Sequence, residues 1–349
     1  MLMGSTNRNT LQIKKNGITL AGSMIVDIVK SIDVYPKMGQ LANLQEFKRA
    51  IGGCVPNTAT DLAVIDSKLK VSAIGKVGMD DNGQFLLKKL QEKNIDVSKI
   101  SIVETPTSFC DVMSIPNGER TFFSFRGANS DFSPMDICSD ELDCKILHIG
   151  YLLLLDKFDE SDEEFGTATA RFLRDVQLKG IKTSIDVVSS SNVEEFSQKV
   201  KPALRYVDYL IINELECCNI WGLFCRKEND EIDVENVRLA MLKCLDYGVR
   251  EKVIVHAKES AFCLDKDGSF TTVGSLIIPK EFIKGSVGAG DAFCAGSLYA
   301  IYNDYSDRDI LEFASGAAAC SLFEANAVDG MRNKNEIQKV IKRFERRKV

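Results

Sequence analysis

Short apolar runs alternate along this chain with longer segments in which apolar residues recur at helical spacing. The short runs are rich in β-branched residues and occupy residues 18–23, 71–75, 146–150, 182–186, 209–213 and 252–256. Between them lie amphipathic segments at 82–93, 163–179 and 234–247. Apolar runs without polar alternation, separated by helices, indicate parallel strands that are covered on both faces. The pattern therefore predicts an α/β fold.

Two segments break this alternation. Residues 28–50 lack the helix that should follow the first strand and contain Pro36 and Gly39 instead. Residues 106–126 alternate between apolar and polar positions on either side of Asn117-Gly118, which is a strong β-hairpin signal. We therefore expect a small β-sheet, inserted from about 28–50 and 106–127, over one edge of the main sheet. Because ligands bind beyond the carboxyl ends of parallel strands, this sheet is a candidate lid, and a plain surface hairpin is the alternative.

The chain length bounds the number of domains. At 349 residues the chain fits one large domain with a small addition, which we place at 17–345. Residues 1–16 are polar and lack the hydrophobic core of a signal peptide, so we expect a flexible N-terminus. The longest apolar run, residues 151–155, is far shorter than the ~20 residues that cross a bilayer, and we expect no membrane partner.

Charge and composition narrow the chemistry. The chain carries 44 Lys+Arg and 50 Asp+Glu, a net charge of −6, without a long basic block, so a nucleic-acid partner is disfavoured. Its two histidines, His148 and His256, exclude a His-rich metal site and a HExxH zinc centre. The eleven cysteines form no repeated CxxC pair, which indicates packing residues in a reducing, cytoplasmic compartment. Metal-free or oxygen-ligated chemistry is therefore the expectation.

The most informative segment is residues 285–299, where four glycines in twelve residues run into a helical pattern. Gly288, Ala289 and Gly290 would let backbone N–H groups converge at a helix N-terminus, which suits a phosphoryl group. Asp291 follows in the first turn, where a carboxylate is electrostatically favoured. A simple glycine-rich turn is the alternative. The segment is neither a Walker A loop nor a dinucleotide fingerprint, because the lysine and the third glycine are missing.

Two further segments carry candidate binding residues. In residues 51–63, Gly52-Gly53 allows close approach of the backbone to a ligand, and Asn57 can both donate to and accept from a hydroxyl. Asn213 and Glu216 lie at the end of the predicted strand 209–212, where an acidic residue can hold Mg²⁺ through water. For both segments an ordinary helix start is the alternative.

Together these segments resemble the ribokinase-like carbohydrate kinases, also called the phosphofructokinase-B family. The resemblance runs in order from about residue 17 to residue 344. Its five motifs are residues 22–27 (first-strand substrate motif), 51–63 (Gly-Gly-x-x-x-Asn), 74–83 (after the third strand), 213–216 (Asn-x-x-Glu) and 285–296 (Gly-Ala-Gly-Asp). The resemblance implies a three-layer α/β/α fold with a mainly parallel central sheet and a small β-sheet lid.

The resemblance also implies roles for particular residues. Asp291 would be the general base that takes the proton from a substrate hydroxyl, and the amides of Gly288, Ala289 and Gly290 would hold the transferring phosphoryl group. ATP and Mg²⁺ are the implied cofactors, with Asn213 and Glu216 positioning the metal and the phosphates, and Glu216 reaching Mg²⁺ through water. The remaining implied contacts are Ser286 and Asn326 on the nucleotide side, and Asp27, Gly52, Gly53 and Asn57 on the sugar side.

The chain departs from the family pattern at three places. Gly285 and Ser286 stand where the family has Asp and Thr, and because that Asp lies near a monovalent-cation site, activation by K⁺ is in doubt. Residues 257–260 replace the Gly-x-x-Gly of the adenine loop. Asp186 is followed by Val-Val, without the Asn/Arg of several sugar kinases.

The leading functional hypothesis is an ATP-dependent kinase that phosphorylates a primary hydroxyl of a sugar or sugar acid. A nucleoside kinase is the alternative, since lid phenylalanines such as Phe109 and Phe122 could stack on a base. A non-catalytic sugar-binding regulator is disfavoured by the intact run 288–291, and an NAD oxidoreductase by the misplaced glycine motif. Because a Phe-rich lid leaves apolar surface and strand edges uncovered, we expect a homodimer that packs lid to lid.

Overall fold

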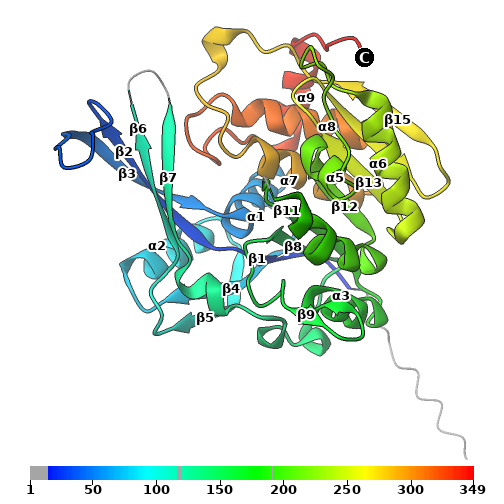
Figure 1. The fold of residues 1–349 in the computed structure, drawn as a ribbon, viewed down its shortest axis with the longest axis horizontal. Coiled ribbons are helices and arrows are strands. Elements are labelled where there is room, and N and C mark those ends of the chain that lie inside the picture. The colour runs from blue at the N-terminus through cyan, green and yellow to red at the C-terminus, as the bar shows by residue number, and fades with distance from the viewer. Residues whose placement is uncertain (1–14, 116–118, 191) are drawn as a thin grey trace, which may run out of the picture.

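The computed structural model describes residues 15–115, 119–190 and 192–349, and it is built around a nine-stranded sheet (Figure 1). The strand order is β15-β14-β13-β12-β11-β8-β1-β4-β5. The strands are β1 (Ile18–Gly22), β4 (Val71–Gly78), β5 (Asp96–Val103), β8 (Ile146–Leu152), β11 (Lys182–Val187), β12 (Tyr209–Asn213), β13 (Lys252–His256), β14 (Ser260–Asp265) and β15 (Phe270–Gly274). Only the pairs β13–β14 and β14–β15 are antiparallel among the pairs in this sheet. The six strands expected from the apolar runs are confirmed.

Helices cover both faces of this sheet, and each face has its own apolar core. Along a strand the side chains alternate between the two cores: Ile211 belongs to one, and Leu210 and Ile212 belong to the other. One core is closed by α1 (Cys54–Ile65), α2 (Asp81–Gln91), α7 (Ala289–Tyr302), α8 (Asp307–Ser321) and α9 (Lys334–Arg343). The other is closed by α3 (Ala168–Leu178), α5 (Glu214–Asn219) and α6 (Val234–Tyr247). The expected three-layer α/β/α fold is confirmed.

The helix expected at 163–179 begins later than its apolar pattern indicates. Asp162 accepts hydrogen bonds from the amides of Glu164 and Phe165, and Gly166 has φ 89°, so the chain turns back on itself before the helix. Two short strands, β9 (Ser161–Asp162) and β10 (Gly166–Thr167), result. The hydroxyl of Thr167 then accepts from the amide of Ala170 at 3.2 Å and caps α3. The prediction of helix for residues 163–167 was therefore wrong.

A second, four-stranded sheet extends away from the helical layers (Figure 1), and we call it the lid sheet. Its strands are β2 (Ile25–Ile32), β3 (Leu44–Gly52), β6 (Phe109–Ser114) and β7 (Arg120–Phe125), in the order β3-β2-β6-β7. The antiparallel pair β6–β7 matches the expected hairpin, whose turn at Asn117-Gly118 lies outside the described residues, as do residues 1–14 of the expected flexible N-terminus. Arg126 anchors the lid sheet to the body by donating to the carbonyl of Leu154 at 2.8 Å.

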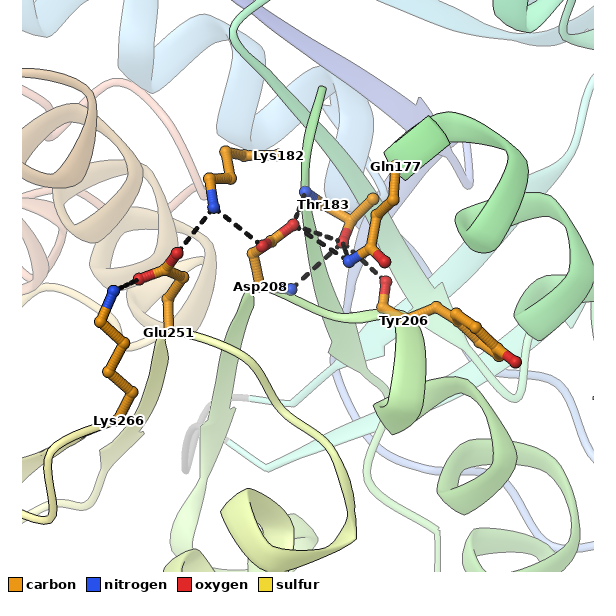
Figure 2. A network of polar contacts seen from close by, with 7 residues as sticks. All are labelled: Gln177, Lys182, Thr183, Tyr206, Asp208, Glu251 and Lys266. Carbon is orange, nitrogen blue, oxygen red and sulfur yellow. Dashed lines mark hydrogen bonds and ion pairs between the residues drawn. The ribbon is translucent and has the colours of Figure 1, made fainter. Parts of the chain in front are cut away.

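The amino-terminal ends of three central strands are tied together by a polar network (Figure 2). Lys182 at the start of β11 bridges Asp208, which precedes β12, and Glu251, which precedes β13, at 3.1 and 2.7 Å. Asp208 is almost fully buried and also accepts from the amide of Thr183 at 2.9 Å. This network fixes the sheet at the edge opposite the strand carboxyl ends. Within the described residues, no helix combines the length and apolar character needed to cross a membrane.

Candidate active site

The carboxyl ends of four neighbouring strands meet around a cavity of about 250 Å³. Each strand contributes a polar residue at its end: Tyr151 from β8, Asp186 from β11, Asn213 from β12 and His256 from β13. The first turn of α7, including Asp291, closes the same cavity. This is the position at which ligands bind in open α/β sheets.

A second cavity of about 330 Å³ adjoins the first. The two share His256, Ser286, Ala289 and Gly290, so the glycine-rich loop forms the boundary between them. The second cavity is more apolar and is lined by residues that include Lys258, Leu276, Phe293, Ala318 and Leu322. An apolar cavity beside a more polar one fits a ligand that has one apolar part and one charged part.

The glycine-rich loop has the conformation that converging amides require. Gly288 is the N-cap of α7 with φ 80°, in the left-handed region that favours glycine. A Cβ at Gly288 would lie 2.5 Å from the carbonyl oxygen of Ala327, so no other residue fits without displacing that segment. The first-turn amides of a helix have no intrahelical acceptor, and here the positive end of a 14-residue helix faces both cavities. The amide of Ala289 donates to the carbonyl of Ser286 at 3.3 Å. The positive end of the helix remains a favourable environment for an anion.

Asp291 is 5% exposed and held by two donors from other elements. The side-chain amide of Asn57 donates to its Oδ2 at 2.9 Å, and the hydroxyl of Tyr151 lies 2.9 Å from its Oδ1. Burial, followed by the charge of Asp186, raises the pKa of Asp291 to about 7, and the two hydrogen bonds act in the opposite direction. A buried carboxyl with a pKa close to neutrality has the properties of a general base.

The residues expected to bind substrate lie on the lid strands β2 and β3 and at the start of α1. Burial raises the pKa of Asp27 on β2 to about 6. A Cβ at Gly52 would lie 2.5 Å from Oδ2 of Asp27, so glycine is what permits the carboxylate to lie there. Gly53, with φ 82°, then starts α1, which carries Asn57. The Oδ1 of Asn57 is buried and finds no hydrogen-bond partner among the described residues, which leaves an acceptor for a ligand.

Asn213 and Glu216 form a capping box at the start of α5. The amide of Asn213 donates to Oε2 of Glu216 at 2.9 Å, and the amide of Glu216 donates to Oδ1 of Asn213 at 2.8 Å. Ser189 donates to the other carboxylate oxygen of Glu216 at 2.7 Å, and burial raises the pKa of Glu216 to about 7. The helix-start alternative thus holds, and both residues also line the first cavity. With its oxygens engaged by protein donors, Glu216 is suited to a cation contact through water.

The two other residues expected on the nucleotide side, Ser286 and Asn326, differ in their position. Ser286 lines both cavities. Asn326 is not among the described residues that line them, and its side chain instead bonds Asp329 and the amide of Val328. A Cβ at Gly285 would lie 3.2 Å from the Cα and the carbonyl oxygen of Ala325, so the loop around Asn326 packs directly on the glycine-rich loop.

Three residues at strand ends line the first cavity but were not expected from the sequence to belong to the site: Tyr151, Asp186 and His256. Burial lowers the pKa of His256 to about 4, so its ring is neutral at physiological pH, and it packs 4.8 Å from the ring of Phe293. All three lie at the carboxyl ends of strands that were recognised from their apolar runs. Reading the polar residues at each strand end, without requiring a motif, would have found them.

Three comparisons with known proteins are consistent with this geometry. A family model described as pfkB family carbohydrate kinase matches residues 18–334. A 5-dehydro-2-deoxygluconokinase of Clostridium perfringens is 25% identical over 347 residues, covering 95% of this chain and 94% of the relative. A ribokinase of Arabidopsis thaliana, solved with ribose and ATP, superposes with a TM-score of 0.77 at 21% identity, covering 94% of this chain and 99% of that one. A Methanocaldococcus jannaschii nucleoside kinase reaches a TM-score of 0.73 at 16% identity, with 95% and 99% covered.

Proposed function

The chain belongs to the pfkB family of carbohydrate kinases, and from this membership we propose that it transfers the γ-phosphoryl group of ATP to a primary hydroxyl of a sugar or sugar acid. The resemblance drawn from the sequence motifs is confirmed, and the protein is a kinase. In the reaction, the hydroxyl oxygen forms a bond to the γ-phosphorus while the bond from that phosphorus to the β,γ-bridging oxygen breaks. The hydroxyl proton passes to a base, and ADP leaves.

The observation that carries the proposal is the position of Asp291. Its buried carboxyl lies in the first turn of α7, directly after the glycine-rich loop, and it is held by Asn57 and Tyr151. In this proposal Asp291 takes the hydroxyl proton while the amides of residues 288–290 stabilise the charge on the transferring group. Phosphoryl transfer depends mostly on positioning and charge stabilisation, so one base and one amide cradle suffice.

We propose that ATP and Mg²⁺ occupy the two adjoining cavities. In the proposal the adenine ring occupies the more apolar cavity of about 330 Å³, and the phosphates lie over the glycine-rich loop. Asn213 and Glu216, both with oxygen donors, are the residues suited to Mg²⁺, and Glu216 contacts it through water. Bound Mg²⁺ neutralises charge on the β- and γ-phosphates. Because Gly285 supplies no carboxylate, the proposal does not include activation by K⁺.

For the acceptor we propose a sugar or sugar acid rather than a nucleoside. Asp27 and the free Oδ1 of Asn57 offer acceptors for hydroxyl groups, and the Clostridium perfringens relative is named for a sugar-acid substrate. On the lid sheet the rings of Phe109 and Phe125 pack on each other with centroids 5.2 Å apart, which favours a packing role over stacking on a base. The nucleoside alternative remains an outcome of the substrate test.

A substrate panel with a base-dead variant tests this function. Asp291→Asn keeps the shape of the side chain and removes its basicity, so kcat should fall by about 10²–10⁴-fold while sugar binding persists. Asp309→Asn is the matched control, because Asp309 occupies the same third position of the neighbouring helix α8, away from both cavities, and full turnover is expected. ADP release is measured with sugars, sugar acids and nucleosides. Turnover of nucleosides alone would overturn the acceptor class, and near-normal turnover by Asp291→Asn would overturn the role of Asp291.

The lid sheet leads us to propose a homodimer. Its outer strands carry exposed phenylalanines, with Phe47 on β3 71% exposed and Phe122 on β7 61% exposed. Apolar strands at uncovered sheet edges are usually covered by a partner, and a second lid sheet offers matching edges.

We also propose a cytoplasmic location, because all eleven cysteines lie in the described part of the chain and carry free thiols.

A further inference from the structure

Three side chains that can ligate a metal converge beneath the first cavity. His148 comes from β8, Asp186 from the end of β11 and Cys294 from the first turns of α7. The Nε2 of His148 lies 3.5 Å from Oδ2 of Asp186 and 3.7 Å from Sγ of Cys294. One ligand atom from each residue lies within 4.8 Å of the others. The proposed kinase reaction gives His148 and Cys294 no task.

The two separations from His148 match those of a tetrahedral zinc site. Zinc binds imidazole nitrogen and carboxylate oxygen at about 2.0–2.2 Å and thiolate sulfur at about 2.3 Å. With tetrahedral angles, these bond lengths place the nitrogen about 3.4 Å from the oxygen and about 3.6 Å from the sulfur. The observed distances of 3.5 and 3.7 Å agree with both values. The third separation, from Asp186 to Cys294, lies within the 4.8 Å that spans the group, so these two side chains would move toward each other when a cation binds.

The neighbours of the three side chains orient them toward one another. The Nδ1 of His148 is 3.0 Å from the hydroxyl of Ser184, which leaves Nε2 as the nitrogen that faces the thiol and the carboxylate. The Oδ1 of Asp186 accepts from the amide of Tyr151 at 2.5 Å, which leaves Oδ2 facing His148. Partners of this kind, on the far side of each ligand, fix ring orientation and tautomer in metal sites.

The exposure, charge and ligand atoms of the three side chains indicate which kind of ion they could bind. His148, Asp186 and Cys294 are 1%, 7% and 3% exposed, and the last two line the cavity, so a fourth coordination position opens toward it. A divalent cation with one thiolate, one carboxylate and a neutral imidazole has no net charge, which permits burial. A thiolate and an imidazole favour zinc-like ions over Mg²⁺, which prefers oxygen.

We propose that His148, Asp186 and Cys294 form a binding site for a zinc-like divalent cation, with an open fourth position at the floor of the active-site cavity. The site is separate from the oxygen donors of Asn213 and Glu216, and it does not rest on the proposed function. The competing explanation is a metal-free polar cluster that only helps to join β8, β11 and α7.

Cobalt(II) is the probe that separates the two explanations, because a Co²⁺–thiolate bond gives a charge-transfer absorption band. Chelator-treated wild-type protein should bind Co²⁺ with this band, and Zn²⁺ added afterwards should displace Co²⁺ and abolish the band. Cys294→Ser should bind one equivalent of Co²⁺ less than the wild type, and its charge-transfer absorbance should fall accordingly. His148→Gln should weaken the affinity for this Co²⁺ ion by at least about 100-fold. Cys320→Ser, which changes a buried cysteine on the neighbouring helix α8, is the control and should bind as the wild type does.

A second measurement avoids the folding of the variants altogether. Crystals of the wild-type protein soaked in zinc should show an anomalous difference peak at the zinc absorption edge between the three side chains. Unchanged cobalt binding by a folded Cys294→Ser variant, or soaked crystals that lack this peak, would overturn the proposal.

Discussion

The hydroxyl of Tyr151 lies within 2.9 and 3.1 Å of the two carboxylate oxygens of Asp291. Tyr151 has φ 62°, in the left-handed region that a tyrosine seldom adopts, and its amide donates to Asp186 at 2.5 Å. The carboxylate of Asp186 thus holds the backbone that aims the hydroxyl at Asp291. Three elements, β8, β11 and α7, are joined in this way at the point where we place the chemistry.

The link between Tyr151 and Asp291 predicts a shift in the pH dependence of turnover. A general base works only when deprotonated, so kcat should fall as pH drops through the pKa of Asp291, which is about 7. Because the Tyr151 hydroxyl favours the charged carboxylate, Tyr151→Phe should raise that pKa and move the acidic limb to higher pH by about one unit. Tyr209→Phe, at the opposite edge of the sheet, should leave the profile unchanged. An unmoved limb in Tyr151→Phe would contradict the role of this hydrogen bond.

The charge of Asp186 predicts a shift in the opposite direction. After burial, Asp186 is the largest cause that raises the pKa of Asp291, because two nearby carboxylates disfavour each other's charge. Asp186→Asn removes the charge and keeps an oxygen that can accept from the Tyr151 amide. In protein without a cation bound at Asp186, the acidic limb of the kcat–pH profile should therefore move to lower pH. An acidic limb that stays in place or moves to higher pH would show that the charge of Asp186 does not raise the pKa of Asp291.

The fold was predictable where burial alone dictates it. The central strands are covered by helices on both faces, so their sequences are continuous apolar runs, and each of the six was found. The start of α3 was missed because it depends on Asp162 bonding two amides of the next turn, an interaction that competes with helix and leaves no periodic signal. The lid strand β2 was expected only as part of a small β-sheet drawn from residues 28–50, without bounds of its own, because its side chains are partly exposed on both faces.

The candidate site was predictable where its residues lie close together in sequence. Spacing within a single helix start was enough to identify the glycine-rich loop with Asp291. The same is true of Asn213 and Glu216. Tyr151, Asp186 and His256 carry no local motif, because their environment is made by strands that meet only in the folded chain. The same holds for His148 and Cys294, which are 146 positions apart in sequence and 3.7 Å apart in the structure. A count of histidines and cysteines does not reveal a mixed site of this kind.

The lid sheet predicts a dimer that specific surface changes should dissociate. Replacing Phe47 and Phe122 together by serine removes apolar surface from both outer strands without opening a cavity, because both side chains are already exposed. Light scattering coupled to gel filtration should show a dimer for the wild type and a monomer for the double variant, with little change in thermal stability. Phe224→Ser, which alters an 83% exposed phenylalanine outside the lid sheet, should remain dimeric. A wild-type monomer at micromolar concentration would contradict the proposed interface.

A buried carboxyl on α1 predicts an unusual dependence of stability on pH. Asp61 is fully buried and neither carboxylate oxygen has a hydrogen-bond partner among the described residues. Burial, and secondarily the charge of Asp291, raises the pKa of Asp61 well above its ordinary value. A carboxyl whose pKa is higher in the folded state favours folding below its unfolded pKa of about 3.9, and this contribution is lost as pH rises.

Asp61→Asn abolishes that titration, so the variant should gain stability relative to the wild type as pH rises from 5 to 8. Urea unfolding at both pH values should show the difference in unfolding free energy widening by at least about 1 kcal/mol. Asp66→Asn is the matched control at the end of the same helix, where an ion pair with Lys334 at 2.7 Å helps to lower the carboxyl pKa despite the opposing effect of burial. Asp66→Asn should instead be less stable than the wild type at pH 8. This difference in unfolding free energy should shrink at acidic pH, where the Asp66 carboxylate of the wild type becomes protonated. If Asp61→Asn fell below the wild type as pH rose, Asp61 would have to be ionised and paired in the folded protein.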